Sequence, residues 1–236
     1  DNSFTMYDGQ ILACTATNGA GVYVKNNTFA MQAGTIESCI ATYLGGGIAS
    51  EGATVTMGSA AKIRNCSVGV TSPQEWGCKG GGVYLFDNAA SQLNMLSGSE
   101  ISGCSAKTGI TDLSRIFGSG GGIYIEPQAK ATLNEASITG CVADHHGGGI
   151  FTRKYANLTT TNLTFTGNSA GFYRIPADNI LAGAYANCAT ALSISLNVEN
   201  DLAGRDYALN NYDINYHSYM VSYNGNGGTD SALDPN

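Results

Sequence analysis

Hydrophobic and other residues alternate along much of the chain, and the alternation returns as one pattern at five places between residues 3 and 153. Each unit contains an apolar strand, a short turn, a strand ending in a cysteine as in "ISGC", a second turn, and a glycine cluster that leads into a strand as in "GGGIY". Such alternation is typical of half-buried strands. The apolar positions that precede the cysteines by eight or nine residues are Met6, Met31, Met57, Leu96 and Leu133.

The cysteines hold one place in every unit, at spacings of 25, 27, 38 and 37 residues. Zinc sites usually need pairs separated by two to four residues, and disulfide frameworks usually mark smaller domains. Stacked parallel strands explain the spacing better, because equivalent positions of successive units then lie about 4.8 Å apart. We therefore predict a structural file that stacks Cys14, Cys39, Cys66, Cys104, Cys141 and, from "LTFTGNSA", Asn168.

Three strands per unit and parallel stacking predict an all-β fold, a right-handed parallel β-helix of about six rungs with a C-terminal β cap. The glycines would lie at sharp turns where a Cβ is obstructed, since no Lys-Ser or Lys-Thr follows them as in a phosphate-binding loop. We expect residues 1–170 to form the repeats and residues 171–218 to cover the last open edge. Cys78 and Cys188 lie outside the file, and the sequence does not decide whether they form a disulfide with each other.

The "GGGIY" and "FTGNSA" elements resemble the repeats of parallel β-helix surface proteins of bacteria, including the polymorphic outer-membrane adhesin type, over residues 4–170. The chain differs in carrying Cys where most of those repeats have Asn. "YMVSYNGNGGTDSALDP", within residues 219–236, resembles the opening of a Listeria-Bacteroides repeat, a β-grasp-like module, and could also be a linker. Both resemblances imply an extracellular protein of the bacterial cell surface, with further modules in the same chain.

The composition of the chain limits the classes of partner that it can be expected to bind. The net charge is −7 and the pI is near 4.8, and no cluster of Lys or Arg offsets the acidic background. This argues against nucleic acid and anionic membranes as partners. No apolar run approaches the roughly 20 residues that span a bilayer, so we expect no membrane insertion of this segment. The motifs indicate neither a cofactor nor a metal.

Two connections between cysteine and glycine cluster are long, with 13 residues in "SVGVTSPQEWGCK" and 15 in "SAKTGITDLSRIFGS". Because their units are adjacent, we expect them to protrude side by side. Aromatic faces beside carboxylates and a guanidinium suit sugar binding, but a small core of Trp76, Ile116 and Phe117 under the loops is the preferred interpretation. The candidate ligand-binding residues, with those of the next unit, are Glu75, Trp76, Asp112, Arg115, Phe117, Asp144, His145 and His146.

A second column follows from strand alternation. If Val22 and its equivalents point inward, an aromatic column faces outward. It could bind a polysaccharide, but reinforcement of the sheet, or burial under the cap, is the preferred interpretation. The charged residues of the next column alternate in the sign of their charge, which predicts a solvated face. This column consists of Lys25, Glu51, Phe86, Glu126 and Arg153. The aromatic column consists of Tyr23, Tyr84, Tyr124 and Phe151.

Enzymatic chemistry would require more than the fold. A glycoside hydrolase needs two facing carboxylates, and a calcium-dependent lyase needs clustered acidic ligands. Acidic residues here are sparse, and Asp112, Asp144, His145 and His146 are the best acid-base or metal set. We therefore predict a noncatalytic module, an adhesin or a ligand-presenting spacer whose partner is a host glycan or surface protein. The alternative is a polysaccharide lyase or glycoside hydrolase using a groove on one sheet.

Overall fold

A computed structural model describes residues 3–69, 77–109 and 118–171, together with the short strands at 194–197 and 214–216. Within these residues the fold is all-β, with mostly parallel strands in three sheets, and the single helical turn is the 3-10 turn η1 (Tyr155–Asn157). None of the described helical residues forms a segment long and apolar enough to cross a membrane.

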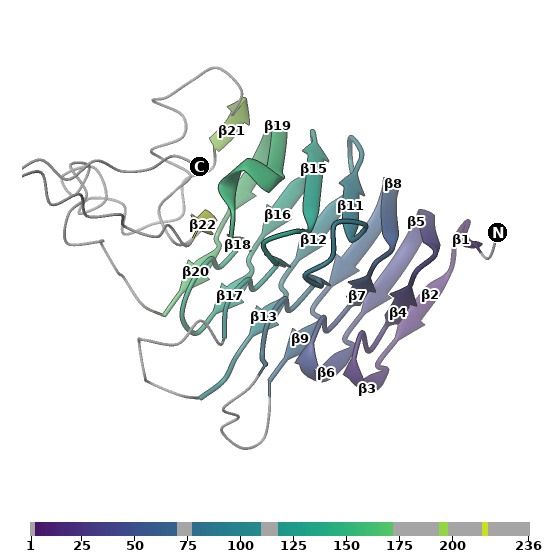
Figure 1. The fold of residues 1–236 in the computed structure, drawn as a ribbon, viewed down its shortest axis with the longest axis horizontal. Coiled ribbons are helices and arrows are strands. Elements are labelled where there is room, and N and C mark those ends of the chain that lie inside the picture. Colours follow the sequence, from purple (N-terminus) through teal and green to yellow (C-terminus); the bar gives the residue numbers. More distant parts are fainter. Residues whose placement is uncertain (1–2, 70–76, 110–117, 172–193, 198–213, 217–236) are drawn as a thin grey trace, which may run out of the picture.

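The strands fall into sheets A, B and C, which the chain visits in turn (Figure 1). Sheet A contains β1 (Ser3–Met6), β2 (Gln10–Leu12), β5 (Thr28–Glu37), β8 (Thr54–Arg64), β11 (Gln92–Met95), β12 (Glu100–Ser102), β15 (Lys130–Asn134), β16 (Ser137–Thr139), β19 (Leu158–Thr166) and β21 (Ile194–Asn197). Sheet B contains β3 (Thr15–Asn18), β6 (Ile40–Leu44), β9 (Ser67–Val68), β13 (Ser105–Ala106), β17 (Val142–Ala143) and β20 (Ser169–Ala170). Sheet C contains β4 (Val22–Lys25), β7 (Ile48–Glu51), β10 (Val83–Leu85), β14 (Ile123–Ile125), β18 (Ile150–Thr152) and β22 (Ile214–Tyr216).

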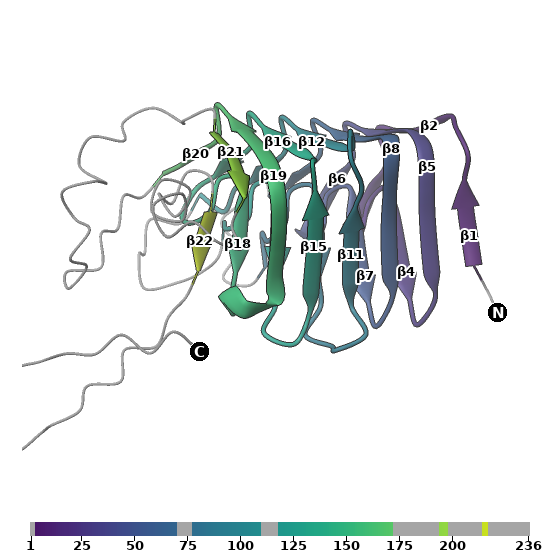
Figure 2. The ribbon, with the colours of Figure 1, turned by 90° about the horizontal axis from the view of Figure 1, so that it is seen from above.

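Successive repeats, which we name by their cysteines, pair in register, so equivalent side chains form files along the stack (Figure 2). In sheet A, Met31 pairs with Met57 and Met57 with Met95, and all three are buried. The sequence-based assignment of Leu96 to this file was wrong, because Leu96 lies one position beyond Met95 and is 47% exposed. This architecture is consistent with a parallel β-helix.

The glycine clusters occupy the corner between sheets B and C. Gly121 illustrates the constraint, since a Cβ there would lie 2.4 Å from the carbonyl oxygen of Gly148 and 2.5 Å from that of Val142. Backbone hydrogen bonds run from cluster to cluster, including Gly121 N–H to Gly147 O at 3.0 Å. Glycine is therefore required for close backbone approach between repeats.

The two ends of the stack differ. The repeat of Cys14 leaves Phe4 56% exposed, whereas the equivalent Phe29 of the next repeat is fully buried. At the other end, β21 pairs antiparallel with β19, and β22 pairs parallel with β18. The rest of the segment 172–236, including Cys188, lies outside the described residues.

Candidate functional site

The cysteine file lies inside the stack. Cys39, Cys66, Cys104 and Cys141 are fully buried and Cys14 is partly buried, and none of these thiols is in a disulfide. Each buried thiol donates to a carbonyl of the preceding repeat, at 3.6–3.9 Å, as Cys104 does to Ile63. Asn168 takes the same place: its Nδ2 donates to Ile138 O at 2.9 Å, and its Oδ1 accepts from Cys141 N–H at 2.9 Å.

The outward aromatic column lies on sheet C and is buried over most of its length. Tyr84, Tyr124 and Phe151 are 5%, 0% and 1% exposed, and only Tyr23 of the column is open, at 44%. The ring centroids of Tyr84 and Tyr124 are 5.5 Å apart, and those of Tyr124 and Phe151 are 4.9 Å apart. These rings pack against one another across neighbouring strands of the sheet.

An ionic cluster flanks these rings. Glu126 is 6% exposed, and its Oε1 accepts from Lys79 Nζ at 2.9 Å and from the Tyr84 hydroxyl at 2.8 Å. Arg153 lies 3.7 Å from Oε2, and the Lys79 ammonium lies 4.8 Å from the centroid of Tyr124. Burial, and then the charge of Glu126, raise the pKa of Tyr84 far above its ordinary value.

This cluster corrects one expectation and was not found from the sequence. The column from Lys25 to Arg153 was expected to be a solvated face, which fits the exposed Lys25 and its half-buried partner Glu51 but not the buried Glu126. The sequence contained the information needed to find the cluster. Lys79 precedes one glycine cluster and Glu126 follows the next, and the two repeats pair in register. A lysine side chain is long enough to reach across one strand spacing.

The bases of the two long connections are described, although their middles are not. Both ends of the second one are held by the Cys141 repeat. The Asp144 carboxylate accepts from the N–H groups of Thr108 and Gly109 at 2.7 and 3.0 Å, and His145 N–H donates to Gly118 O at 2.9 Å. We call Asp144 and His145 the clamp. It fixes where residues 110–117 leave and rejoin the scaffold.

The first long connection rejoins the scaffold beside the clamp. Cys78 is fully buried. Its burial, and to a smaller extent the nearby charge of Asp144, raise the pKa of its thiol to about 11. His145 and His146 are 0% and 8% exposed, with ring centroids 6.1 Å apart, and His146 lies 6.1 Å from Phe151. The side chains of Asp144, His145 and His146 therefore lie at the loop bases. Lying outside the described residues are Glu75, Trp76, Asp112, Arg115 and Phe117.

Replacing Asp144 with alanine should loosen the base of the second connection. The change leaves the N–H of buried Thr108 without its acceptor, at a cost of about 1–3 kcal/mol, while the N–H of exposed Gly109 can bond to water. Hydrogen exchange of these two amides should accelerate in Asp144→Ala. Asp144→Asn is the matched control, because its amide oxygen can still accept both bonds. Equal protection in the alanine variant would contradict the clamp.

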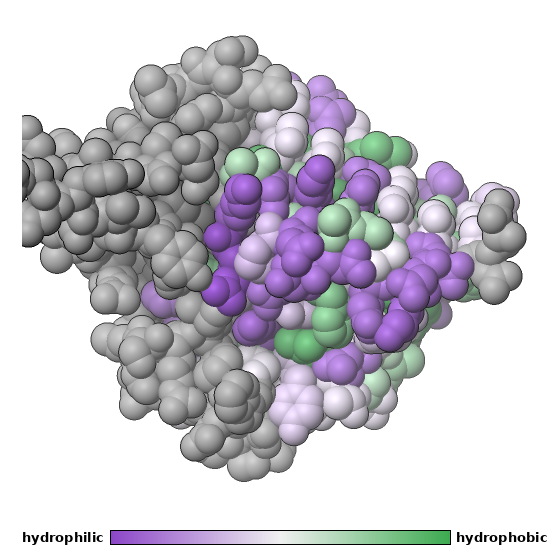
Figure 3. Space-filling view, in the orientation of Figure 1, coloured by the Kyte–Doolittle hydropathy of each residue, from purple (hydrophilic) through white to green (hydrophobic). Residues whose placement is uncertain are grey.

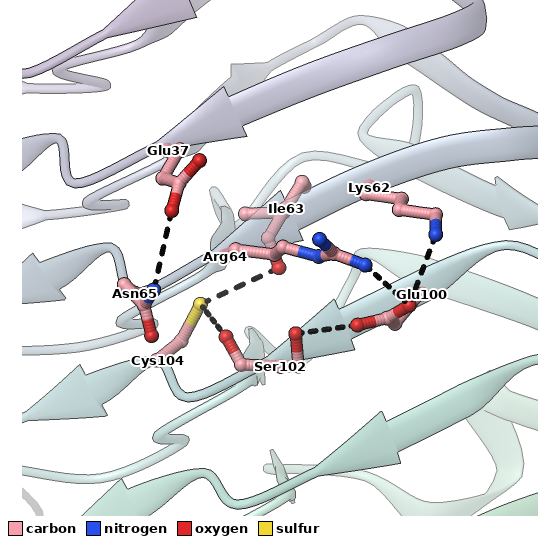
Figure 4. A network of polar contacts seen from close by, with 8 residues as sticks. All are labelled: Glu37, Lys62, Ile63, Arg64, Asn65, Glu100, Ser102 and Cys104. Carbon is pink, nitrogen blue, oxygen red and sulfur yellow. Dashed lines mark hydrogen bonds and ion pairs between the residues drawn. The ribbon is translucent and has the colours of Figure 1, made fainter.

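A surface network lies on the outer face of sheet A (Figure 4). Arg64 and Lys62 approach Glu100 Oε2 at 3.1 and 3.7 Å, and Ser102 donates to its Oε1 at 2.6 Å. Burial tends to raise the pKa of Glu100, but these hydrogen bonds and charges outweigh it and hold the pKa below its ordinary value. Figure 3 shows many further hydrophilic residues on the face of the molecule that is turned to the viewer.

Every carboxylate of the described residues has a bonding partner in the protein. The partners are basic, hydroxyl or amide side chains, or backbone N–H groups. Within the same residues, no three His, Cys, Asp or Glu side chains come together as a metal site. These carboxylates belong to Asp8, Glu37, Glu51, Asp87, Glu100, Glu126, Glu135 and Asp144.

Comparisons of the chain with protein-family models, with curated proteins and with solved structures found no significant match.

Proposed function

We propose that the chain is a noncatalytic module of an exported bacterial surface protein, which holds two long connections side by side for a host glycan or surface protein. The observation that supports this most directly is the clamp, since one repeat ties both ends of the connection that leaves its neighbour. Binding residues are often carried by loops on a rigid scaffold. The proposal includes a right-handed β-helix of about six rungs, with residues 171–218 as its cap.

The resemblance of "GGGIY" and "FTGNSA" to bacterial adhesin repeats supports the extracellular, cell-surface location in this proposal. Residues 219–236 would begin a Listeria-Bacteroides-type repeat. The bonding state of the carboxylates in the described residues favours binding over catalysis, because a glycosidase acid and base must be available to substrate and water. Glu126 illustrates the point, since Lys79 and Tyr84 already occupy its Oε1.

A glycan and mucin array tests the proposal. The purified chain should bind at least one neutral or acidic glycan class, and Trp76→Ala and Phe117→Ala should each lose most of that signal, because aromatic stacking is removed. Tyr7→Ala is the matched control, since Tyr7 is 77% exposed and belongs to the Cys14 repeat. The proposal would be contradicted if every glycan signal of the wild type survived both loop substitutions, or if shorter sugars were released from the array.

A further inference from the structure

A polar hollow lies at the edge of sheet A, on the first four repeats. Its volume is about 310 Å³, near the lower limit for ligand sites in proteins. The starts of β1, β5, β8 and β11 lie side by side along this edge (Figure 2). The hollow is lined by Ser3, Asn26, Asn27, Thr28, Gly52, Thr54, Ala90 and Gln92.

Gly52 accounts for the concave shape. Its φ is +60°, and a Cβ at this position would lie 2.5 Å from Asn26 Oδ1 and 3.0 Å from Asn88 Nδ2. The two amides therefore occupy the space that a Cβ would need, and Gly52 itself is half-buried. Its N–H is bonded to Ser91 Oγ at 2.9 Å, which fixes the floor.

The lining forms an ordered row of neutral hydrogen-bonding groups. Ser3, Thr28, Thr54 and Gln92 pair in register, and the next residue of each strand belongs to the inward-facing file, as fully buried Phe29 does. Their side chains thus face outward at about 4.8 Å intervals. Within the described part of the chain they have no hydrogen-bond partner, so their donors and acceptors are available.

The charge and hydrogen-bonding groups of the lining restrict the class of ligand. None of the lining residues is charged, and Lys25 and Glu51 form an ion pair at 2.7 Å. Lys130, which pairs with Gln92, lies one strand beyond the row and outside the lining. Tyr23 is 44% exposed, lies three residues before Asn26, and contacts Phe86 edge to face with centroids 6.2 Å apart. The ring of Tyr23 is not part of the lining, so the hydroxyl and amide groups carry the choice of ligand. They suit a neutral polyhydroxylated ligand, whereas an acidic glycan would require a cation.

We propose that this hollow is a binding subsite for a short stretch of neutral glycan, lying across the strands along the stack. Each sugar hydroxyl can exchange hydrogen bonds with the row of Ser3, Thr28, Thr54 and Gln92. The subsite is independent of residues 70–76 and 110–117, and so of the ligand proposed for them.

Titration of the purified chain with cello-, xylo- and mannohexaose, followed by amide chemical shifts, tests this subsite. One of these should shift the amides of Thr28, Gly52 and Thr54 and bind in the millimolar range or tighter, while hexagalacturonate should not. Thr28→Val with Thr54→Val removes two hydroxyls without changing side-chain volume, and we expect binding about tenfold weaker.

The control pair is Thr56→Val with Thr132→Val, which lies on outward positions of the same sheet but outside the hollow. This pair, and Trp76→Ala, should bind as the wild type does, so failure here is distinguishable from failure of binding at the long connections. The proposal is overturned if no neutral hexasaccharide binds, if hexagalacturonate binds equally well, or if both threonine pairs behave alike.

Discussion

Replacing Cys104 with aspartate is expected to unfold the middle of the stack. Cys104 is fully buried, and its thiol donates to Ile63 O at 3.9 Å and lies 3.5 Å from Ser102 O (Figure 4). An ionised aspartate would present an acceptor, and no donor, to these two carbonyl oxygens, and burying a carboxylate against them costs several kcal/mol. At about 2–4 °C per kcal/mol for a chain of this size, the midpoint of thermal unfolding should fall by about 10 °C or more.

Cys104→Asn is the matched variant, because Asn has the shape of Asp but can donate. Asn168 already makes this arrangement in the same file, with Nδ2 2.9 Å from Ile138 O. We therefore expect Cys104→Asn to lose much less stability than Cys104→Asp in thermal unfolding followed by circular dichroism. An unchanged midpoint in the aspartate variant would refute the buried file as a support of the fold.

The second large effect is expected for Gly121→Ala. The added Cβ would lie 2.4 and 2.5 Å from two backbone oxygens of the next repeat, which cannot move without separating the repeats. Overpacking of this kind costs about 1–3 kcal/mol and more where backbone must shift. A fall of about 5–10 °C in the unfolding midpoint is expected from these costs.

Gly140→Ala separates this steric effect from backbone strain. Gly140 has a φ of +61°, and its nearest surrounding atom would be 3.8 Å from a Cβ, so only the left-handed conformation is penalised, by about 1–2 kcal/mol. Gly121→Ala should be clearly the less stable variant in chemical denaturation. If the two variants unfold at the same denaturant concentration, close approach between repeats does not explain the glycine clusters.

Ala20 shows where such a side chain is tolerated. It occupies the place of Gly46 and Gly121 in the first repeat, and its N–H to Gly45 O bond is 3.3 Å, compared with 3.0 Å for Gly121 to Gly147. Within the described residues, no repeat packs on the other side of the Cys14 repeat, so that repeat can shift outward. The constraint therefore belongs to the repeats that are packed on both faces.

The parallel all-β character could be predicted because it depends on periodic features of the sequence. Cys and Gly recur at fixed places in each unit. Because the units stack in register, residues at the same place in successive units lie above one another and form files. Counting back eight or nine residues from each cysteine was less reliable, because a slip of one residue exchanges the two faces of a strand. That slip assigned Leu96, instead of Met95, to the core file.

The environment of the outward files could not be predicted in the same way. The alternation of the strand predicts that the side chains of Tyr124 and Glu126 point to the outer side of the sheet. It does not predict which residues surround them there. Their burial depends on Lys79 and Arg153, which come from neighbouring repeats and meet Glu126 only through the register. The clamp is similar, since Asp144 bonds backbone N–H groups, which no side-chain motif reveals.

The clamp has a consequence for how such a chain can diversify. Because backbone groups at Thr108, Gly109 and Gly118 define the exit and return points, the residues between them can change in number and kind without altering the files. Lengthening a loop whose ends are already fixed is thermodynamically inexpensive, about 0.6 kcal/mol for each doubling. Sequences of different recognition chemistry could therefore be grafted at this corner while the core stays the same.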